Sequence, residues 1–87
     1  MNFGQALELL KQGKKVARQG WNGKGQFIYY VPDGRYPART DVAKEIMAED
    51  GKVSYRAYLA IKTVQGDVVP WVASQTDLIE EDWVEVA

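Results

Sequence analysis

The stretch of residues 53–63, VSYRAYLAIKT, constrains the fold more than any other part of this sequence. Its side chains alternate with a period of two residues, which is the period of a β-strand. One face would carry Val53, Tyr55, Ala57, Leu59 and Ile61, and the other Ser54, Arg56, Tyr58, Ala60 and Lys62. The stretch therefore predicts one continuous strand and requires a sheet around it.

A second strand follows directly, so the sheet should be antiparallel. Gly66 and Asp67 suit the two central positions of a two-residue hairpin turn, because primed turns favour glycine at the first of them. Residues 68–73 would return as the paired strand. Pro70 lies within it and cannot donate a ladder hydrogen bond, which places this strand at an edge of the sheet or at a bulge.

The remaining elements are short. Asn2 and Gln5 have the spacing of a capping box, and a helical period runs from Phe3 to Leu10 until Gly13 ends it. Further strands are predicted at 14–18, 26–31 and 83–86, a turn at 32–34, a loop at 35–40, a helix at 41–50 closed by Gly51, and a short helix opened by Ser74 and running to 81. We expect an α+β fold, a small single domain of residues 1–87, with a mostly antiparallel sheet, an N-terminal helix and one or two short helices.

The chain is short, and its stability should therefore be marginal. With 87 residues it buries only about 60 % of the surface of its unfolded form. It contains neither cysteine nor histidine, which excludes disulfides and the usual zinc and iron sites, so no metal and no cofactor is expected. Self-association is the remaining way to bury more apolar surface, and three Trp, five Tyr and two Phe suit an interface.

Charge and hydropathy narrow the partners. A net charge of −1 without a basic run argues against binding a nucleic-acid polymer, although a small anion remains open. No segment is apolar for the length of a membrane span, and the first residues lack the features of a signal peptide. We expect a cytoplasmic protein of bacterial or phage type.

Catalysis finds little support in the residue types. Nucleophilic triads and Cys–His pairs need residues that the chain lacks, although a Ser–Lys pair stays open. Asp41, Glu45 and Glu49 repeat every four residues, which is typical of a solvated helix face. The glycines of residues 20–25 match neither a P-loop nor a dinucleotide fingerprint in spacing.

The loop GWNGKG at residues 20–25 is the first candidate binding site. Trp21 offers a flat surface on which a base can stack, and Asn22 can contact a polar edge. Backbone N–H groups around Gly23 can face a phosphate, and Lys24 adds positive charge. The alternative is that Trp21 only fills the core, since most aromatic residues of a small domain do so.

The second candidate is PWVASQTD, residues 70–77, in which an indole precedes a predicted helix N-terminus. Such a terminus has free N–H donors and a partial positive charge. The candidate binding residues here are Trp71, Ser74, Gln75, Thr76 and Asp77. Together with Trp21 they could form a nucleotide clamp, or both tryptophans could be packing residues.

These same two segments resemble a known family, the Thoeris anti-defence two proteins of phages and prophages. The most specific matches are ARQGWNGKG at residues 17–25 and PWVASQTDLIEEDW at residues 70–83, and the resemblance covers nearly the whole chain. Membership would imply a sponge that sequesters glycocyclic ADP-ribose-type immune signals without degrading them. It would also imply a homotetramer with signal sites at subunit interfaces, and, for some members, a separate site for cyclic di- or trinucleotides.

Carried onto this sequence, the resemblance makes Trp21 the residue that stacks on the adenine or walls the pocket, with Asn22, Gly23 and Lys24 beside it. Residues 71–77 would form a second wall from the same or a neighbouring subunit. Arg18 and Arg56 are candidates for phosphate contacts, because a guanidinium matches phosphate oxygens, and the alternative for both is a surface strand position. Two other functions stay open: an enzyme that degrades the signal, and an oligomeric structural or protein-interaction module without a nucleotide ligand.

Overall fold

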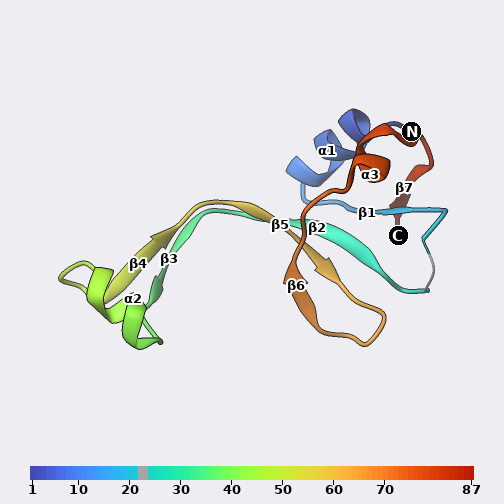
Figure 1. Cartoon of the computed structure of the whole chain (residues 1–87). Helices are drawn as coiled ribbons and strands as arrows, with labels where there is room; N and C mark the ends of the chain where they lie inside the picture. Colours follow the sequence, from blue (N-terminus) through green and yellow to red (C-terminus); the bar gives the residue numbers. More distant parts are fainter. Residues whose placement is uncertain (22–23) are drawn as a thin grey trace.

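The computed structural model describes residues 1–21 and 24–87. Its elements, in chain order, are α1 (Phe3–Lys11), β1 (Lys15–Arg18), β2 (Phe27–Val31), β3 (Gly34–Pro37), α2 (Asp41–Ile46), β4 (Lys52–Tyr55), β5 (Tyr58–Lys62), β6 (Val68–Pro70), α3 (Gln75–Ile79) and β7 (Trp83–Val86). The chain has two parts: a body built on a five-stranded sheet, and an arm, made of β3, α2 and β4, that projects from it (Figure 1). The α+β fold with an antiparallel sheet is confirmed.

The sheet of the body has the strand order β6-β5-β2-β1-β7, and all its neighbours are antiparallel. The register pairs Val16 with Ile28 and Ile28 with Ile61, so these three side chains share one face. β6 lies at one edge, where the missing N–H of Pro70 is tolerated, as its position in the sequence predicted.

The N-terminal helix α1 forms where the sequence predicts it, and for the predicted reasons. The Asn2 side chain accepts a hydrogen bond from the Gln5 N–H, and the Gln5 side chain accepts one from the Asn2 N–H. Gly13 ends the helix with a φ of 87°, a conformation that glycine adopts without strain. α1 packs on β1, β2 and β7, and it covers one face of the sheet.

Trp83 is the largest side chain of the core. It is 1 % exposed and packs with Ala6 and Leu10 of α1 and with Val16 and Ile28 of the sheet. Its indole N–H donates to the backbone oxygen of Asp77 at 2.8 Å, which satisfies the one polar atom that its burial would otherwise leave unpaired. The core therefore lies between α1 and the sheet, around the indole of the last strand.

The arm corrects two expectations. Residues 53–63 form two strands and not one, since the chain bends at Arg56 and Ala57 between β4 and β5. Residues 35–40 were expected to be a loop, but residues 35–37 belong to β3. This strand pairs with β4, with Gly34 opposite Tyr55 and Pro37 opposite Lys52. The partner strand is interrupted at the same level, at Pro32 and Asp33, and both strands leave the body together.

The hairpin between β5 and β6 also differs from its predicted form. The Gly66 N–H donates to the Thr63 oxygen and the Thr63 N–H donates to the Asp67 oxygen, so Val64 and Gln65 are the central residues of the turn. Gly66 follows them with a φ of 96°, in the left-handed region. A tight turn followed by a left-handed glycine is the usual geometry of a three-residue hairpin loop. The glycine was correctly placed in the hairpin, but it stands two positions after the first central residue of the turn, the position predicted for it.

Candidate functional site

Trp21 lies just beyond β1 and packs against two other tryptophans. Its ring centroid is 5.4 Å from that of Trp83 and 6.4 Å from that of Trp71, and both pairs are edge-on. The side chain is half-buried, because its inner part contacts the core while the rest reaches the surface. Trp21 and Trp71 thus come together from segments far apart in the sequence, as the sequence-based clamp requires, but in this arrangement their rings contact each other.

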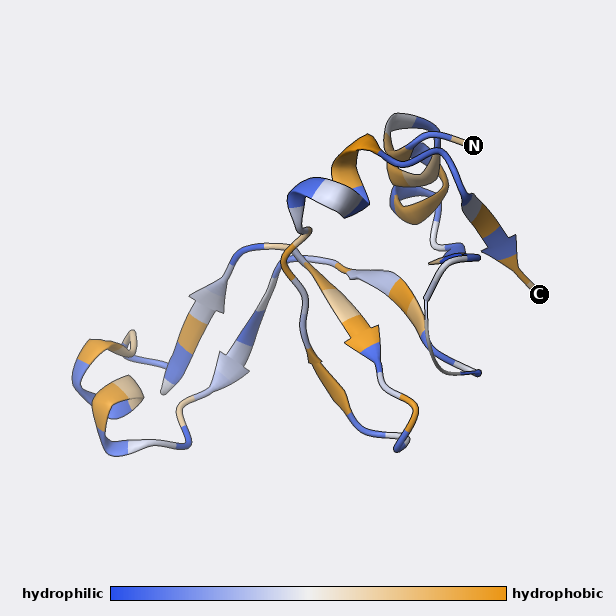
Figure 2. Cartoon of the chain, turned by 45° about the vertical axis from the view of Figure 1, so that its right-hand side comes forward, coloured by the Kyte–Doolittle hydropathy of each residue, from blue (hydrophilic) through white to orange (hydrophobic). Residues whose placement is uncertain are grey.

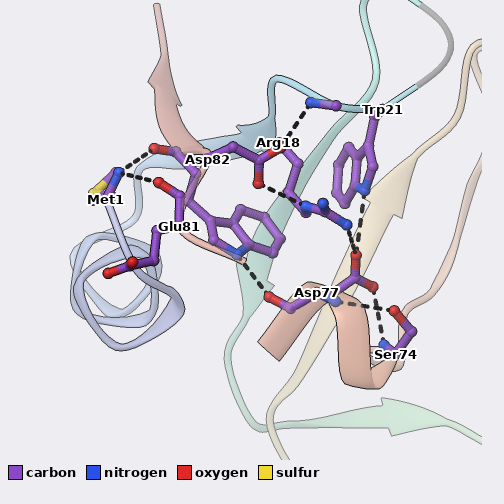
Figure 3. Close-up of polar contacts among 9 residues, drawn as sticks. Met1, Arg18, Trp21, Ser74, Asp77, Glu81 and Asp82 are labelled. Carbon is purple, nitrogen blue, oxygen red and sulfur yellow. Dashed lines mark hydrogen bonds and ion pairs between the residues drawn. The ribbon is translucent and has the colours of Figure 1, made fainter. Parts of the chain in front are cut away.

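Asp77 is the centre of the polar contacts around Trp21 (Figure 3). Its carboxylate Oδ1 accepts from Arg18 Nη1 at 2.9 Å and from Trp21 Nε1 at 3.4 Å, and Oδ2 accepts from the Ser74 N–H at 3.0 Å. Ser74 returns the bond, since its hydroxyl accepts from the Asp77 N–H, and the two residues form the capping box that opens α3. At 8 % exposure this is a buried carboxylate that is fully engaged by its neighbours.

Arg18 is held from both sides. Its Nε donates to Asp82 Oδ1 at 2.8 Å while Nη1 reaches Asp77, and its side chain is only 12 % exposed. The other oxygen of Asp82 accepts the Gly20 N–H at 2.9 Å, which fastens the start of the Trp21 loop. The guanidinium therefore bridges β1, α3 and the segment before β7. The sequence left two alternatives for Arg18, a surface strand position and a phosphate contact. In the structure its guanidinium is neither exposed at the surface nor open to a phosphate, because both carboxylates already bind it.

The ionisation of this cluster follows from its contacts. The bond to Asp82 and then the bond to Asp77 raise the pKa of Arg18. Burial tends to raise the pKa of Asp77, but the N–H of Ser74 and the guanidinium outweigh it and lower that pKa overall. Arg18 is the main cause that lowers the pKa of Asp82. All three groups are charged at neutral pH, and two carboxylates face one guanidinium.

The other predicted site residues lie around this cluster or outside it. Asn22 and Gly23 fall outside the described residues. Lys24, Ser74, Gln75 and Thr76 are exposed. Arg56 is exposed at the bend between β4 and β5, and it takes no part in the hydrogen-bonded cluster shown in Figure 3.

Two hollows open elsewhere on the surface. One, of about 350 Å³, lies on the arm and is lined by tyrosines 36, 55 and 58 together with Pro37, Arg39, Thr40 and Ala43. The other, of about 380 Å³, lies on the sheet of the body and is lined by Gly13, Lys15, Phe27, Tyr29, Lys62 and Val68. Both volumes are at the lower end of the range of small-molecule pockets.

Metal and membrane features are absent from the part of the chain that the structure describes. Residues 1–21 and 24–87 contain no group of three or more acidic side chains arranged to hold a metal ion. None of the helices in these residues combines the length and the apolar character that crossing a bilayer requires.

Sequence reasoning missed two members of the cluster. Asp82 was not among the candidate site residues, and Trp83 was predicted only as the first residue of a strand. In the structure Asp82 binds both Arg18 and Gly20, and Trp83 supports Trp21. The available signal was the motif EDW, residues 81–83, which ends the second family-like segment and contains both missed residues.

In a comparison with known proteins, a family model matches nearly the whole chain, including every residue of this cluster. The model of the Thoeris anti-defense 2-like domain matches residues 1–86. The protein named Thoeris anti-defense 2 of Bacillus phage SP01 is 36 % identical over 92 residues, covering 95 % of this chain and 91 % of that protein.

Proposed function

Because the chain belongs to the Thoeris anti-defense 2 family, we propose that it blocks bacterial Thoeris immunity as a sponge for the immune signal. The ligand is a glycocyclic ADP-ribose-type nucleotide, which the protein binds tightly and does not degrade. It acts in the cytoplasm of the bacterial host during phage infection, as a homotetramer. The observation that carries this proposal is the half-buried Trp21, which reaches the surface while it contacts Asp77, Trp71 and Trp83.

The geometry favours a particular way of binding the base. Trp21 and Trp71 contact each other edge-on, so a base inserted between them would have to separate the rings. We therefore expect the adenine to stack on the solvent side of Trp21, with the exposed Ser74, Gln75 and Thr76 at its edge. Because hydrogen bonds and packing hold the indole beforehand, less side-chain freedom is lost when the ligand binds.

The positive charges that bind the phosphates of the ligand should come from residues outside the cluster around Arg18. Two carboxylates surround Arg18, so its immediate surroundings repel an anion even though the residue itself is cationic. Of the predicted phosphate contacts, Lys24 and Arg56 are the exposed cations. We propose that these two bind the phosphates, that Arg18 fixes the position of the loop, and that a neighbouring subunit completes the pocket.

A sponge places physical demands on binding and none on catalysis. It must hold a scarce ligand against the receptor of the host, which requires high affinity and slow release. Enclosure between subunits serves this purpose, because it removes water from the ligand and places fixed donors around it.

A cyclic di- or trinucleotide is the second ligand that we propose, and the hollow on the arm favours it. Tyr36 and Tyr55 stand edge-on at 5.7 Å and, with Tyr58, offer aromatic surface for a base, while Arg39 and Thr40 can contact a phosphate. This hollow lies on a different part of the chain from Trp21, so the two ligands would not compete directly.

The capture experiment tests the first ligand. Purified protein is mixed with glycocyclic ADP-ribose, unbound nucleotide is removed, the protein is denatured by heat, and the released compound is identified by chromatography. We expect intact ligand, in a ratio of about one per chain or one per two chains for interface sites. Altered nucleotide would indicate an enzyme, and no retained nucleotide would favour an interaction module without this ligand.

Two matched variants separate binding from packing. Trp21→Ala should abolish capture while the protein remains folded and tetrameric. Phe3→Ala removes a ring that also contacts Trp83, at 5.3 Å, but comes from α1 and not from the loop. We expect Phe3→Ala to keep capture at a similar loss of stability. Unfolding of Trp21→Ala alone would show that its main role is to fill the core.

A further inference from the structure

The sheet of the body has one face on which α1 packs, and an opposite face without a helix among the described residues. We call this opposite face the outer sheet face, defined by Lys15, Phe27, Tyr29, Lys62 and Val68, which surround the hollow of about 380 Å³. The register places Phe27 beside Lys62 and Lys62 beside Val68, so the residues come from adjacent strands and project to the same side.

The outer sheet face is apolar at its centre and positively charged around it. The ammonium group of Lys15 lies 5.0 Å from the centroid of the Phe27 ring, and that of Lys62 lies 5.8 Å from it. If the same faces of two copies packed together, these lysines would meet each other at close range. Like charges disfavour that arrangement, so the complementary surface should be apolar and acidic.

The end of the arm has those two properties. Val42 and Ile46 of α2 are 68 % and 69 % exposed, and Glu45 lies next to Val42 on the helix surface, at the i+3 position from it. Ala43 of the same helix, by contrast, is buried, with 8 % of its surface exposed. We call the surface of Val42, Glu45 and Ile46 the arm tip, and Figure 2 shows that the helix at the far end of the molecule, α2, has both hydrophobic and hydrophilic colours.

The shape of the chain keeps the arm tip away from its own core. The Cα radius of gyration is 15.5 Å, whereas a compact chain of this length would have about 12 Å. The longest dimension is 46 Å against 26 and 25 Å for the others, because the arm projects from the body (Figure 1). Apolar side chains at the end of such an arm can be covered only by another molecule.

We propose that the arm tip of one copy binds the outer sheet face of a second copy. Val42 and Ile46 pack on Phe27, Tyr29 and Val68, and Glu45 pairs with the two lysines. This inference deepens the proposed tetramer by naming two surfaces that meet in it, and it does not depend on the identity of the ligand.

The contact would also reach the proposed binding loop. Lys62 Nζ donates to the backbone oxygen of Gly25 at 2.9 Å, so the outer sheet face is attached to the end of the loop that begins at Trp21. An arm tip that holds Lys62 in place would also restrict the movement of Gly25, at the end of this loop. The partner would then help to preorganise the site without touching the ligand.

Charge reversal tests the pairing without ligand. Glu45→Lys and Lys62→Glu should each weaken self-association by about tenfold to a hundredfold, since like charges then meet at the contact. The double variant should regain most of the loss, because the opposite signs are restored. Glu8→Lys is the matched control, for its side chain is 69 % exposed on α1. Masses are measured by sedimentation over a range of protein concentrations.

Cross-linking provides an independent measurement, because the natural chain has no cysteine. Ile46→Cys and Val68→Cys proteins are mixed and oxidised gently, and mass spectrometry should find a disulfide between the two variants. Val72→Cys replaces an 89 % exposed residue outside the outer sheet face and should not form this bond with Ile46→Cys.

Three results would overturn the inference: a wild-type protein that is monomeric at all concentrations, reversed charges without effect on assembly, or equal cross-linking at position 72. None of these measurements contains nucleotide. A failure of signal capture with the cross-link intact would therefore refute the proposed sponge and leave this contact standing, and an assembly through other surfaces would do the reverse.

Discussion

The body and the arm of this protein are built in opposite ways. The body buries Ala6, Leu10, Val16, Ile28 and Trp83 between α1 and a five-stranded sheet. Within the arm, all of whose residues are described, Ala43 is the one buried side chain, and it still has 8 % of its surface exposed. Two strands and a six-residue helix with so small a core are marginal on their own. The arm therefore keeps its shape by continuing β2 and β5, and its tyrosines and valines are available for contact.

The ion pairs repeat this difference. In the body, Arg18 and Asp77 are 12 % and 11 % exposed, and each has further partners. In the arm, Arg35 and Asp50 form a comparable pair at 2.7 Å, but with 48 % and 45 % exposure. Because the first pair is buried, removing one partner should destabilise the fold strongly, since the other charge is then left without compensation. Water screens the second pair, so its loss should matter little.

The largest effect should come from Trp83→Ala. Truncation of a buried aromatic side chain costs about 3–5 kcal/mol, which is a large part of the total of about 4–13 kcal/mol for a chain of this length. The matched change in the arm, Tyr55→Ala, removes a ring that is 48 % exposed and should cost far less. Urea unfolding followed by fluorescence and circular dichroism measures both. Equal losses would mean that the arm contributes a core of its own.

Asp77→Asn should have the next largest effect. The substitution leaves Trp21, Ser74 and Arg18 with a weaker partner, and the loss of a charged hydrogen-bond acceptor in a buried site costs about 1.5–3 kcal/mol. Asp50→Asn in the arm is the control, and its unfolding curve should almost coincide with that of the natural protein. If the two variants were equally stable, the difference in burial would not be the deciding factor.

The same carboxylates predict how stability depends on pH. The pKa values of Asp77 and Asp82 are lowered in the folded state, so near pH 4 the unfolded chain binds more protons than the folded one. Their contribution is therefore complete above about pH 5 and is lost as the pH falls through the lowered folded-state values. Denaturant unfolding at pH 7, 5 and 3.5 should show this decrease, and Asp77→Asn should flatten it. An unchanged slope in the variant would exclude Asp77 as a source.

The smallest effect on the stability of the body should come from removal of the arm. Val31 and Tyr58 are directly paired, so Asn-Gly in place of residues 32–57 can close a two-residue hairpin between β2 and β5. We expect the remaining body to fold with its unfolding free energy changed by about 1 kcal/mol, and to lose self-association. A body that fails to fold would show that the arm stabilises it within one chain.

The local elements could be predicted from the sequence because their signals are local. The capping boxes of Asn2 and Ser74 lie within three residues of their partners, and the edge position of β6 follows from the missing N–H of Pro70. The break at Arg56 and Ala57 could not be predicted in this way. The alternation of residues 53–63 continues across it, and the interruption of the partner strand opposite it, at Pro32 and Asp33, lies more than 20 residues away in the sequence.

The candidate site, too, could be predicted from the sequence only in part. By itself the sequence determined which residue types were present, which metal and catalytic sites were excluded, and, through the segments around Trp21 and Trp71, which family the chain belongs to. Only the tertiary structure decided that Arg18 meets Asp77 and Asp82, 59 and 64 residues away, and so cannot be a simple surface arginine. A guanidinium carries no sequence signal of its partners, because ion pairs over such distances are set by how the strands and helices pack.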